Sequence, residues 1–257
     1  MIGDVVGEPG LKTLEDKLPV IIKDNAVDFT VVNGENSADG FGMTEATLKR
    51  IIASGADVVT SGNHVWEKRE FWNILETDDR VLRPANYPAG CAGKGWYCVE
   101  KAGLKWVVIN LQGRELMTPI DCPFLCFDKI IKGIDNNFPV VIVDFHAESS
   151  REKEALGHYI DGRASLVVGT HTHVQTADER ILPKETAYIT DLGMTGVSES
   201  VIGMDTEICV ERTCKQVLYR MEPAADRQVN GKSRAGVQGV IAEINAESGK
   251  ALSIRRI

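Results

Sequence analysis

Residues able to bind metal ions follow five short apolar runs of this 257-residue sequence. Each run is typical of a buried β-strand, so its polar residues are expected at the carboxyl end of a strand. Ligands of α/β sheets bind beyond these ends, and parallel neighbours would therefore bring the five segments to one site. The segments are Ile2-Gly3-Asp4, Val32-Asn33-Gly34-Glu35-Asn36, Ser61-Gly62-Asn63-His64, Asp144-Phe145-His146 and Gly169-Thr170-His171-Thr172-His173.

The strongest single signal is the pair His171 and His173. Alternate residues of an extended segment point the same way, so these two imidazoles can face two adjacent metal ions. A His-x-His pair alone is about as often structural, and a lone histidine such as His146 is more often structural than a ligand. The fifth histidine, His158, falls inside a predicted helix and is interpreted as structural or solvent-exposed.

The acidic and amide residues also have simpler explanations when each is taken alone. Asp4 and Glu35 could cap helices or face water, and Asn36 and Asn63 could serve turns. Gly34 and Gly62 could likewise serve only tight turns. Two carboxylates, two amides and four imidazoles at five strand ends are too many for turn formation alone. The joint pattern therefore favours a shared metal site.

These segments resemble the calcineurin-like metallophosphoesterases, and specifically their YmdB-type branch. Two departures from the broad superfamily are shared with that branch: Val6 stands at the histidine of the usual Asp-x-His motif, and Glu35 at the aspartate of Gly-Asp. They make activity on large protein substrates less expected without threatening metal binding. The matching segments are Gly3-Asp4-Val5-Val6-Gly7, Asn33-Gly34-Glu35-Asn36, Gly62-Asn63-His64, Asp144-Phe145-His146-Ala147-Glu148, Gly169 to His173, Thr190 to Gly196 and Ser200 to Gly203.

The resemblance implies a dinuclear metal site with Glu35 as the bridging ligand. It assigns Asp4, Asn36 and His173 to one metal and Asn63, His146 and His171 to the other. Imidazole, carboxylate and amide ligands without thiolate suit Fe, Mn or Zn, as divalent or mixed-valence ions, better than Ca. Two such ions about 3.5–4 Å apart can clamp a phosphoryl group and share a bridging hydroxide as nucleophile.

His64 directly follows the predicted ligand Asn63, so we expect it at the rim of the site as the general acid. The resemblance further implies phosphodiesterase activity on 2′,3′- and 3′,5′-cyclic nucleotides. Tyr87 and the loop from Asp39 to Met43, with Gly40 and Gly42, are candidates to line the substrate side, although such turns are more often structural. The substrate-binding residues are otherwise left open.

The remaining pattern predicts an α/β fold of four layers, αββα, with two mixed sheets packed together and helices on their outer faces. Helices are expected at Leu11 to Asn25, kinked or split by Pro19, at Thr44 to Ala53 with Thr44 as cap, at Glu67 to Leu75 and at Arg151 to Ile160. A hairpin is expected across Ala102-Gly103. Strands are expected at Phe29 to Val32, Asp57 to Thr60, Trp96 to Glu100, Lys105 to Asn110, Val140 to Val143 and Leu166 to Val168, and mostly antiparallel ones at Arg180 to Leu182, Thr186 to Thr190, Val237 to Ile244 and Leu252 to Ile257.

Composition limits the partners and the location. The 29 Lys and Arg against 37 Asp and Glu give a net charge of −8, which argues against duplex nucleic acid as a partner. No apolar run is long enough to span a membrane, and the six scattered cysteines are expected to be reduced, which favours the cytoplasm. We expect one domain over residues 1–257, and homo-oligomerisation is left open. Only three residues precede Asp4, so we also expect the natural chain to start earlier.

Two other functions fit parts of the pattern. A metal-dependent amidohydrolase also collects histidines at strand ends, in a barrel, but its His-x-His pair usually opens the chain. A regulatory protein could keep the metals only to bind a phosphorylated ligand. The intact His64 argues modestly against that second alternative.

Overall fold

The larger of two β-layers is a mixed six-stranded sheet. The computed structural model describes residues 1–134, 140–227 and 233–257. The strand order is β4-β5-β6-β7-β9-β8, with β5, β6, β7 and β9 parallel and the two edge strands antiparallel to their neighbours. These strands are β4 (Trp96–Lys101), β5 (Leu104–Gln112), β6 (Val140–His146), β7 (Leu166–Thr170), β8 (Arg180–Ile181) and β9 (Ala187–Ile189).

The second β-layer consists of short ladders joined through the start of the chain. Ile2 bridges Val32 on one side and Gly239 on the other, and β1 pairs with β10 in parallel. The N–H of Asp4 donates to the carbonyl of Gly193 at 3.2 Å, so Asp4 is held in this layer. The strands are β1 (Asp4–Val5), β2 (Val31–Asn33), β3 (Val58–Thr60), β10 (Met194–Val197), β11 (Ala235–Gly236), β12 (Val240–Ile244) and β13 (Ala251–Arg256).

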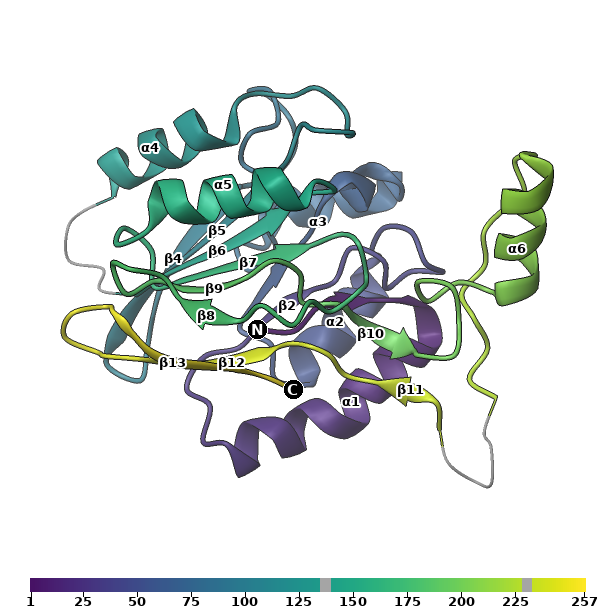
Figure 1. Ribbon diagram of the computed structural model, residues 1–257, viewed down its shortest axis with the longest axis horizontal. Helices are drawn as coiled ribbons and strands as arrows, with labels where there is room; N and C mark the ends of the chain where they lie inside the picture. The colour runs from purple at the N-terminus through teal and green to yellow at the C-terminus, as the bar shows by residue number, and fades with distance from the viewer. Residues whose placement is uncertain (135–139, 228–232) are drawn as a thin grey trace.

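Three apolar clusters separate four layers, and this confirms the predicted αββα architecture. One cluster joins α1 and α2 to the second β-layer, one lies between the two β-layers, and one joins α4 and α5 to the six-stranded sheet. Figure 1 shows α4 and α5 on one side of that sheet and α1 on the far side of the molecule. The helices are α1 (Gly7–Asp24), α2 (Glu45–Ala53), α3 (Trp72–Thr77), α4 (Pro123–Gly133), α5 (Ser150–Ile160) and α6 (Thr206–Lys215).

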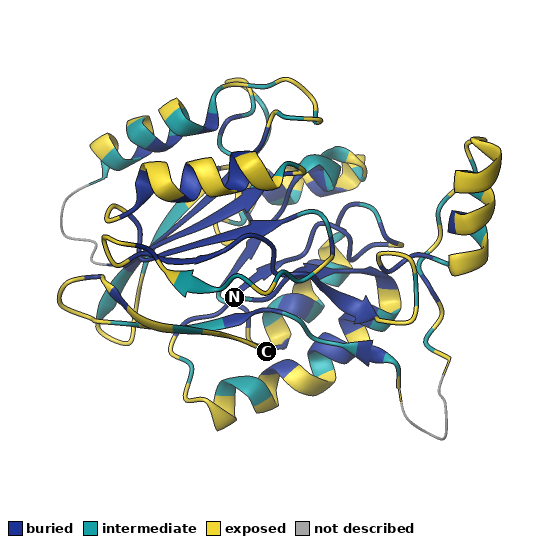
Figure 2. Ribbon diagram, viewed as in Figure 1, coloured by how far each residue is buried: buried dark blue, intermediate teal, exposed yellow. Residues whose placement is uncertain are grey.

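Burial follows the same layering. Figure 2 shows the inner strands of the six-stranded sheet and the strands β1, β2, β3 and β10 as largely buried, whereas β13 and the outward faces of the helices are largely exposed. In the part of the chain that the structure describes, no helix is both long and apolar enough to cross a membrane. All six cysteines are unpaired in the structure, and their reduced state stays a prediction.

Several local predictions are confirmed. Thr44 caps α2, because its hydroxyl accepts from the N–H of Thr47 at 3.2 Å. The hairpin between β4 and β5 turns at Ala102 and Gly103, both with positive φ. A split of α1 at Pro19 was wrong, because the helix continues through this residue. The packing of its buried face, which includes Leu11, Leu14 and Leu18, outweighs one missing hydrogen bond.

Other segments differ from the prediction. The expected helix from Glu67 to Leu75 is a 3₁₀ turn at Arg69–Phe71 followed by the short α3, and α4 and α6 were not predicted. The last third is less antiparallel than expected, since β9 runs parallel to β7 and β10 parallel to β1. Strand direction depends on the distant partner, so the local pattern could not reveal it.

Candidate metal centre

The structure brings all five predicted strand ends to one place. Every residue that the sequence nominated as a metal ligand lies at the carboxyl-terminal edges of the two β-layers, where Figure 1 shows β2, β6 and β7 ending close together. Asp4 lies in β1, Glu35 and Asn36 follow β2, Asn63 and His64 form the 3₁₀ turn after β3, His146 ends β6, and His171 and His173 follow β7.

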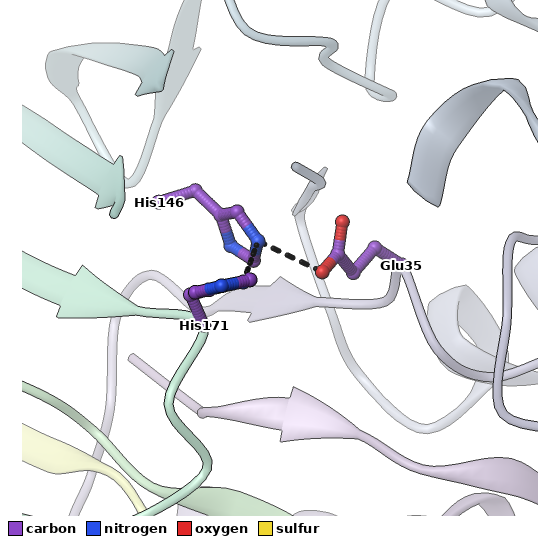
Figure 3. A group of neighbouring side chains, drawn as sticks. All are labelled: Glu35, His146 and His171. Atoms are coloured by element: carbon purple, nitrogen blue, oxygen red, sulfur yellow. Dashed lines mark hydrogen bonds and ion pairs between the residues drawn. The ribbon is translucent and has the colours of Figure 1, made fainter. Parts of the chain in front are cut away.

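A first donor group surrounds the Nε2 atom of His146. Glu35 Oε1 lies 2.9 Å from this nitrogen, His171 Nδ1 lies 3.0 Å from it and Asn63 Oδ1 lies 3.1 Å from it. The donor atoms of Glu35, His146 and His171 all lie within 4.8 Å of one another, and Figure 3 shows the three side chains pointing toward one point. One nitrogen can share at most one proton, so three close neighbours fit a shared cation better than hydrogen bonds alone.

A second donor group surrounds the Nε2 atom of His173. Asn36 Nδ2 lies 3.0 Å from this nitrogen and Asp4 Oδ1 lies 3.8 Å from it. Within the described residues, Asp4 Oδ1 and Asn36 Oδ1 are buried without a hydrogen-bond partner. The two ends of an amide have nearly the same shape, so Asn36 can turn its free oxygen toward the group. Buried oxygens left unpaired are costly, and a bound cation would satisfy them.

The His171 to His173 segment faces both donor groups, but it is not the extended segment that was predicted. His173 donates from Nδ1 to the carbonyl of Ile202 at 2.7 Å, which leaves Nε2 free to act as a ligand. His171 and His173 both have positive φ, 103° and 63°, a strained conformation for residues other than glycine. Such strain is common at functional sites and here lets the two rings diverge toward the two groups.

Burial and mutual charge shift the pKa values of these side chains. Burial opposes ionisation of Glu35, but His146 outweighs it and lowers the pKa of the carboxyl group. Burial also disfavours the charged form of His146, but the nearby Glu35 outweighs burial and raises the pKa of the imidazole. Burial, together with His146, lowers the pKa of His171 to about 3. Burial raises the pKa of Asp4. An ionised Glu35 and a neutral His171 are the forms in which these groups bind metals.

His64 lies at the rim, where a general acid was expected. Its side chain is 26% exposed, and its backbone N–H donates to Glu35 Oε2 at 3.2 Å. The ring of Phe41, from the loop between Asp39 and Met43, meets the His64 ring edge-on with centroids 5.0 Å apart. His158, by contrast, is exposed on α5, as predicted.

The other nominated positions have structural surroundings. Val6 is buried in an apolar cluster with Met194 and Met204, so no ligand stands at this position of the motif. Tyr87 packs edge-on against Trp66 and donates to Gln112 Oε1 at 3.1 Å, which leaves its substrate role a prediction.

Gly62 serves more than a tight turn. A Cβ atom at this position would lie 2.1 Å from the ring of His146, so only glycine lets the imidazole occupy its place. The simpler interpretation of Gly62 as a turn residue is therefore incomplete.

Sequence reasoning missed several residues that support the donor groups. Glu148 Oε2 lies 3.1 Å from His171 Nε2. The buried Lys153 lies 2.6 Å from Asp191, which also accepts from the N–H and the hydroxyl of Thr172 between the two histidines. Glu148 and Asp191 stand inside the matching motifs, which was a usable signal. Lys153 lies on a helix with no local sign of its burial.

Comparisons with known proteins agree with the geometry. A family model described as YmdB-like protein matches residues 1–257. The chain is 45% identical over 256 residues to the 2′,3′-cyclic-nucleotide 2′-phosphodiesterase of Bacillus subtilis, and the match covers 100% of this chain and 94% of that protein.

Two solved structures are similar over the whole chain. A hypothetical protein from Thermus thermophilus has a TM-score of 0.90 and 38% identity, with 100% of this chain and 96% of that chain covered. A novel phosphatase from Mycoplasma pneumoniae has a TM-score of 0.91 and 30% identity, with coverage of 100% and 90%. The resemblance found in the strand-end motifs is confirmed, and the chain belongs to the YmdB-like protein family.

Proposed function

We propose that this phosphodiesterase-type hydrolase cleaves small cyclic-nucleotide diesters with a single domain of residues 1–257. The similarity to the Bacillus subtilis enzyme supports 2′,3′-cyclic nucleotides, whereas 3′,5′-cyclic nucleotides rest on the motif resemblance alone. The observation that carries the proposal is the convergence of Glu35, Asn63 and His171 on one nitrogen of His146. A bound cation explains these three close neighbours of one nitrogen better than hydrogen bonds between the side chains do.

The donor set suits two divalent or mixed-valence ions, with Fe, Mn and Zn as candidates. Asn63, His146 and His171 would hold one ion, Asp4, Asn36 and His173 the other, and Glu35 would lie between them. The two unpaired buried oxygens of Asp4 and Asn36 fit this assignment. A bound metal pair would supply Lewis-acid activation of the phosphodiester and of the attacking water.

His64 supplies the proton for the leaving group in this proposal. The oxygen of a water molecule forms the new P–O bond while the water releases one proton to solvent, one ester P–O bond breaks, and the departing oxygen takes a proton from the His64 ring. The exposure of His64 at the rim lets the ring reach substrate, while its backbone contact with Glu35 fixes its position. General-acid catalysis of this kind contributes typically about 10²–10⁴-fold in rate.

The test compares His64→Ala with His158→Ala, a matched control at an exposed histidine of α5. Both variants are expected to keep the metal content of the parent, measured by plasma mass spectrometry. Only His64→Ala is expected to lose turnover of 2′,3′-cyclic AMP, by about 10²–10⁴-fold. Loss of metal from His64→Ala would show that His64 is a metal ligand. Unchanged turnover would show that His64 is not the general acid.

The two alternative functions fare differently. The amidohydrolase alternative required a barrel, and the fold is instead two packed open β-layers. A protein that binds a phosphorylated ligand without turnover is excluded if hydrolysis of bis-p-nitrophenyl phosphate disappears with chelator and returns with Mn²⁺. Ligand binding without any hydrolysis would favour it.

A further inference from the structure

A buried polar cluster lies directly beneath the donor groups and connects the two β-layers. Its centre is the fully buried carboxylate of Asp144 on β6. Thr170 on β7 donates to Asp144 Oδ1 at 2.7 Å, and Thr60 on β3 donates to Oδ2 at 2.5 Å. Asn33 on β2 also donates to Oδ2, at 3.2 Å. One carboxylate thus ties four strands of both β-layers together under the site.

The hydroxyl of Thr170 donates its single proton to Asp144. Its oxygen must therefore accept in its other contacts, which are with His146 Nδ1 at 2.9 Å and with the amide nitrogen of Asn33 at 3.4 Å. The hydrogen-bond network accordingly assigns a proton to Nδ1 of His146. The opposite ring nitrogen, Nε2, is the atom on which Glu35, Asn63 and His171 converge.

A second arm of the cluster reaches Glu35. Asn33 donates to Asp144 with its amide nitrogen and accepts from the N–H of Glu35 with its amide oxygen, at 3.2 Å. The turn that presents Glu35 is therefore anchored to the same carboxylate. Asp144 and Thr170 do not touch the point of convergence themselves.

We propose that Asp144 and Thr170 are positioning residues that hold His146 with a protonated Nδ1 and an Nε2 available to a metal ion. The inference rests on the proposed function, because it assumes that the first donor group binds a metal. Partners behind a ligating imidazole fix its tautomer and orientation, and their loss typically weakens metal binding about 10–100-fold.

The test uses three variants at two matched hydroxyls. Thr170→Val removes the acceptor of the His146 proton, Thr170→Ser restores a hydroxyl, and Thr60→Val removes an equivalent donor to Asp144 that makes no contact with a ligand. Titration of each metal-free protein with Mn²⁺ in a calorimeter measures binding without any need for catalysis. We expect Thr170→Val to bind Mn²⁺ about 10–100-fold more weakly than the parent, with Thr170→Ser and Thr60→Val near the parent.

Circular dichroism establishes which variants fold, and Asp144→Asn provides a second test if Thr170→Val does not. Asp144→Asn is expected to weaken Mn²⁺ binding by a similar factor, because the new amide group can donate to the Thr170 hydroxyl. That hydroxyl would then donate to His146 Nδ1 instead of accepting from it. Equal Mn²⁺ binding by Thr170→Val, Thr170→Ser and Thr60→Val would overturn this inference and leave the proposed function standing. Failure of the parent to bind Mn²⁺ would overturn both.

Discussion

Replacing Gly62 by alanine tests the geometry of the site with a single methyl group. The new Cβ would lie 2.1 Å from the His146 ring, whereas an ordinary contact begins at 3.4 Å, so the ring must move by about 1.3 Å. His146 is fully buried and contacts Thr170 and His171, so a displaced ring must also disturb these neighbours. A misplacement of about 1 Å in a catalytic arrangement can cost about 10²-fold in rate.

Gly157→Ala is the matched control. Its Cβ would lie 2.6 Å from the ring of Tyr188, in the core between α5 and the six-stranded sheet and away from the donor groups. Both changes overpack a methyl against a buried ring, so each is expected to cost about 1–3 kcal/mol in the free energy of unfolding. Urea denaturation measures this loss.

Only Gly62→Ala should also impair the site. We expect its Mn²⁺-dependent turnover of bis-p-nitrophenyl phosphate to fall by at least about 10²-fold, while Gly157→Ala stays near the parent. Mn²⁺ titrations of the rate separate weaker metal binding from slower turnover at saturation. If Gly62→Ala matches Gly157→Ala in both stability and turnover, the contact between Gly62 and His146 does not constrain the site.

Three further outcomes are expected. Burial opposes ionisation of Asp178, but hydrogen bonds from Thr176 and Thr190 lower its pKa overall. The carboxylate therefore stabilises the fold fully above its unfolded pKa of about 3.9. This stabilisation is lost as the pH falls through the lowered pKa of the folded state. Asp178→Asn should therefore lower the free energy of unfolding by about 1–2 kcal/mol at pH 7, measured by urea denaturation. An equally large difference between parent and variant well below about pH 3 would contradict this. Phe127→Ala should cost about 3–5 kcal/mol by the same measurement, because the ring is fully buried between α4 and the sheet; a loss under about 1 kcal/mol would contradict its core position. Chelation should lower the melting temperature, since a metal at about 100 times its Kd stabilises by about 2.7 kcal/mol, and an unchanged melting temperature would speak against bound metal.

The convergence of the site could be predicted because its signal is local. Each nominated residue follows a short apolar run, and the ends of parallel strands meet at one edge of a sheet. The structure brings Asp4, Glu35, His146 and His173 together accordingly. The pair His171 and His173 was correctly expected to face two adjacent groups, but the predicted extended alternation was wrong, because positive φ values at both residues turn the rings apart.

Most supporting residues stand inside the matching motifs, but their roles could not be predicted because these depend on distances between remote segments. Thr170 matters through Asp144, 26 positions earlier, and Asn33 reaches the same carboxylate from 111 positions away. Lys153 looks like an ordinary helical lysine until its pairing with Asp191 is known.

The amino-acid sequence by itself determined the kinds of element and the kinds of chemistry. Periodicity of apolar residues specifies strands and helices locally, and the donor atoms at the strand ends favour the prediction of Fe, Mn or Zn over Ca. Tertiary structure alone decided strand directions, the burial of Asp4 and the ring nitrogen that His146 presents. These features depend on hydrogen bonds and packing between segments far apart in the chain, and such contacts exist only once both β-layers have come together.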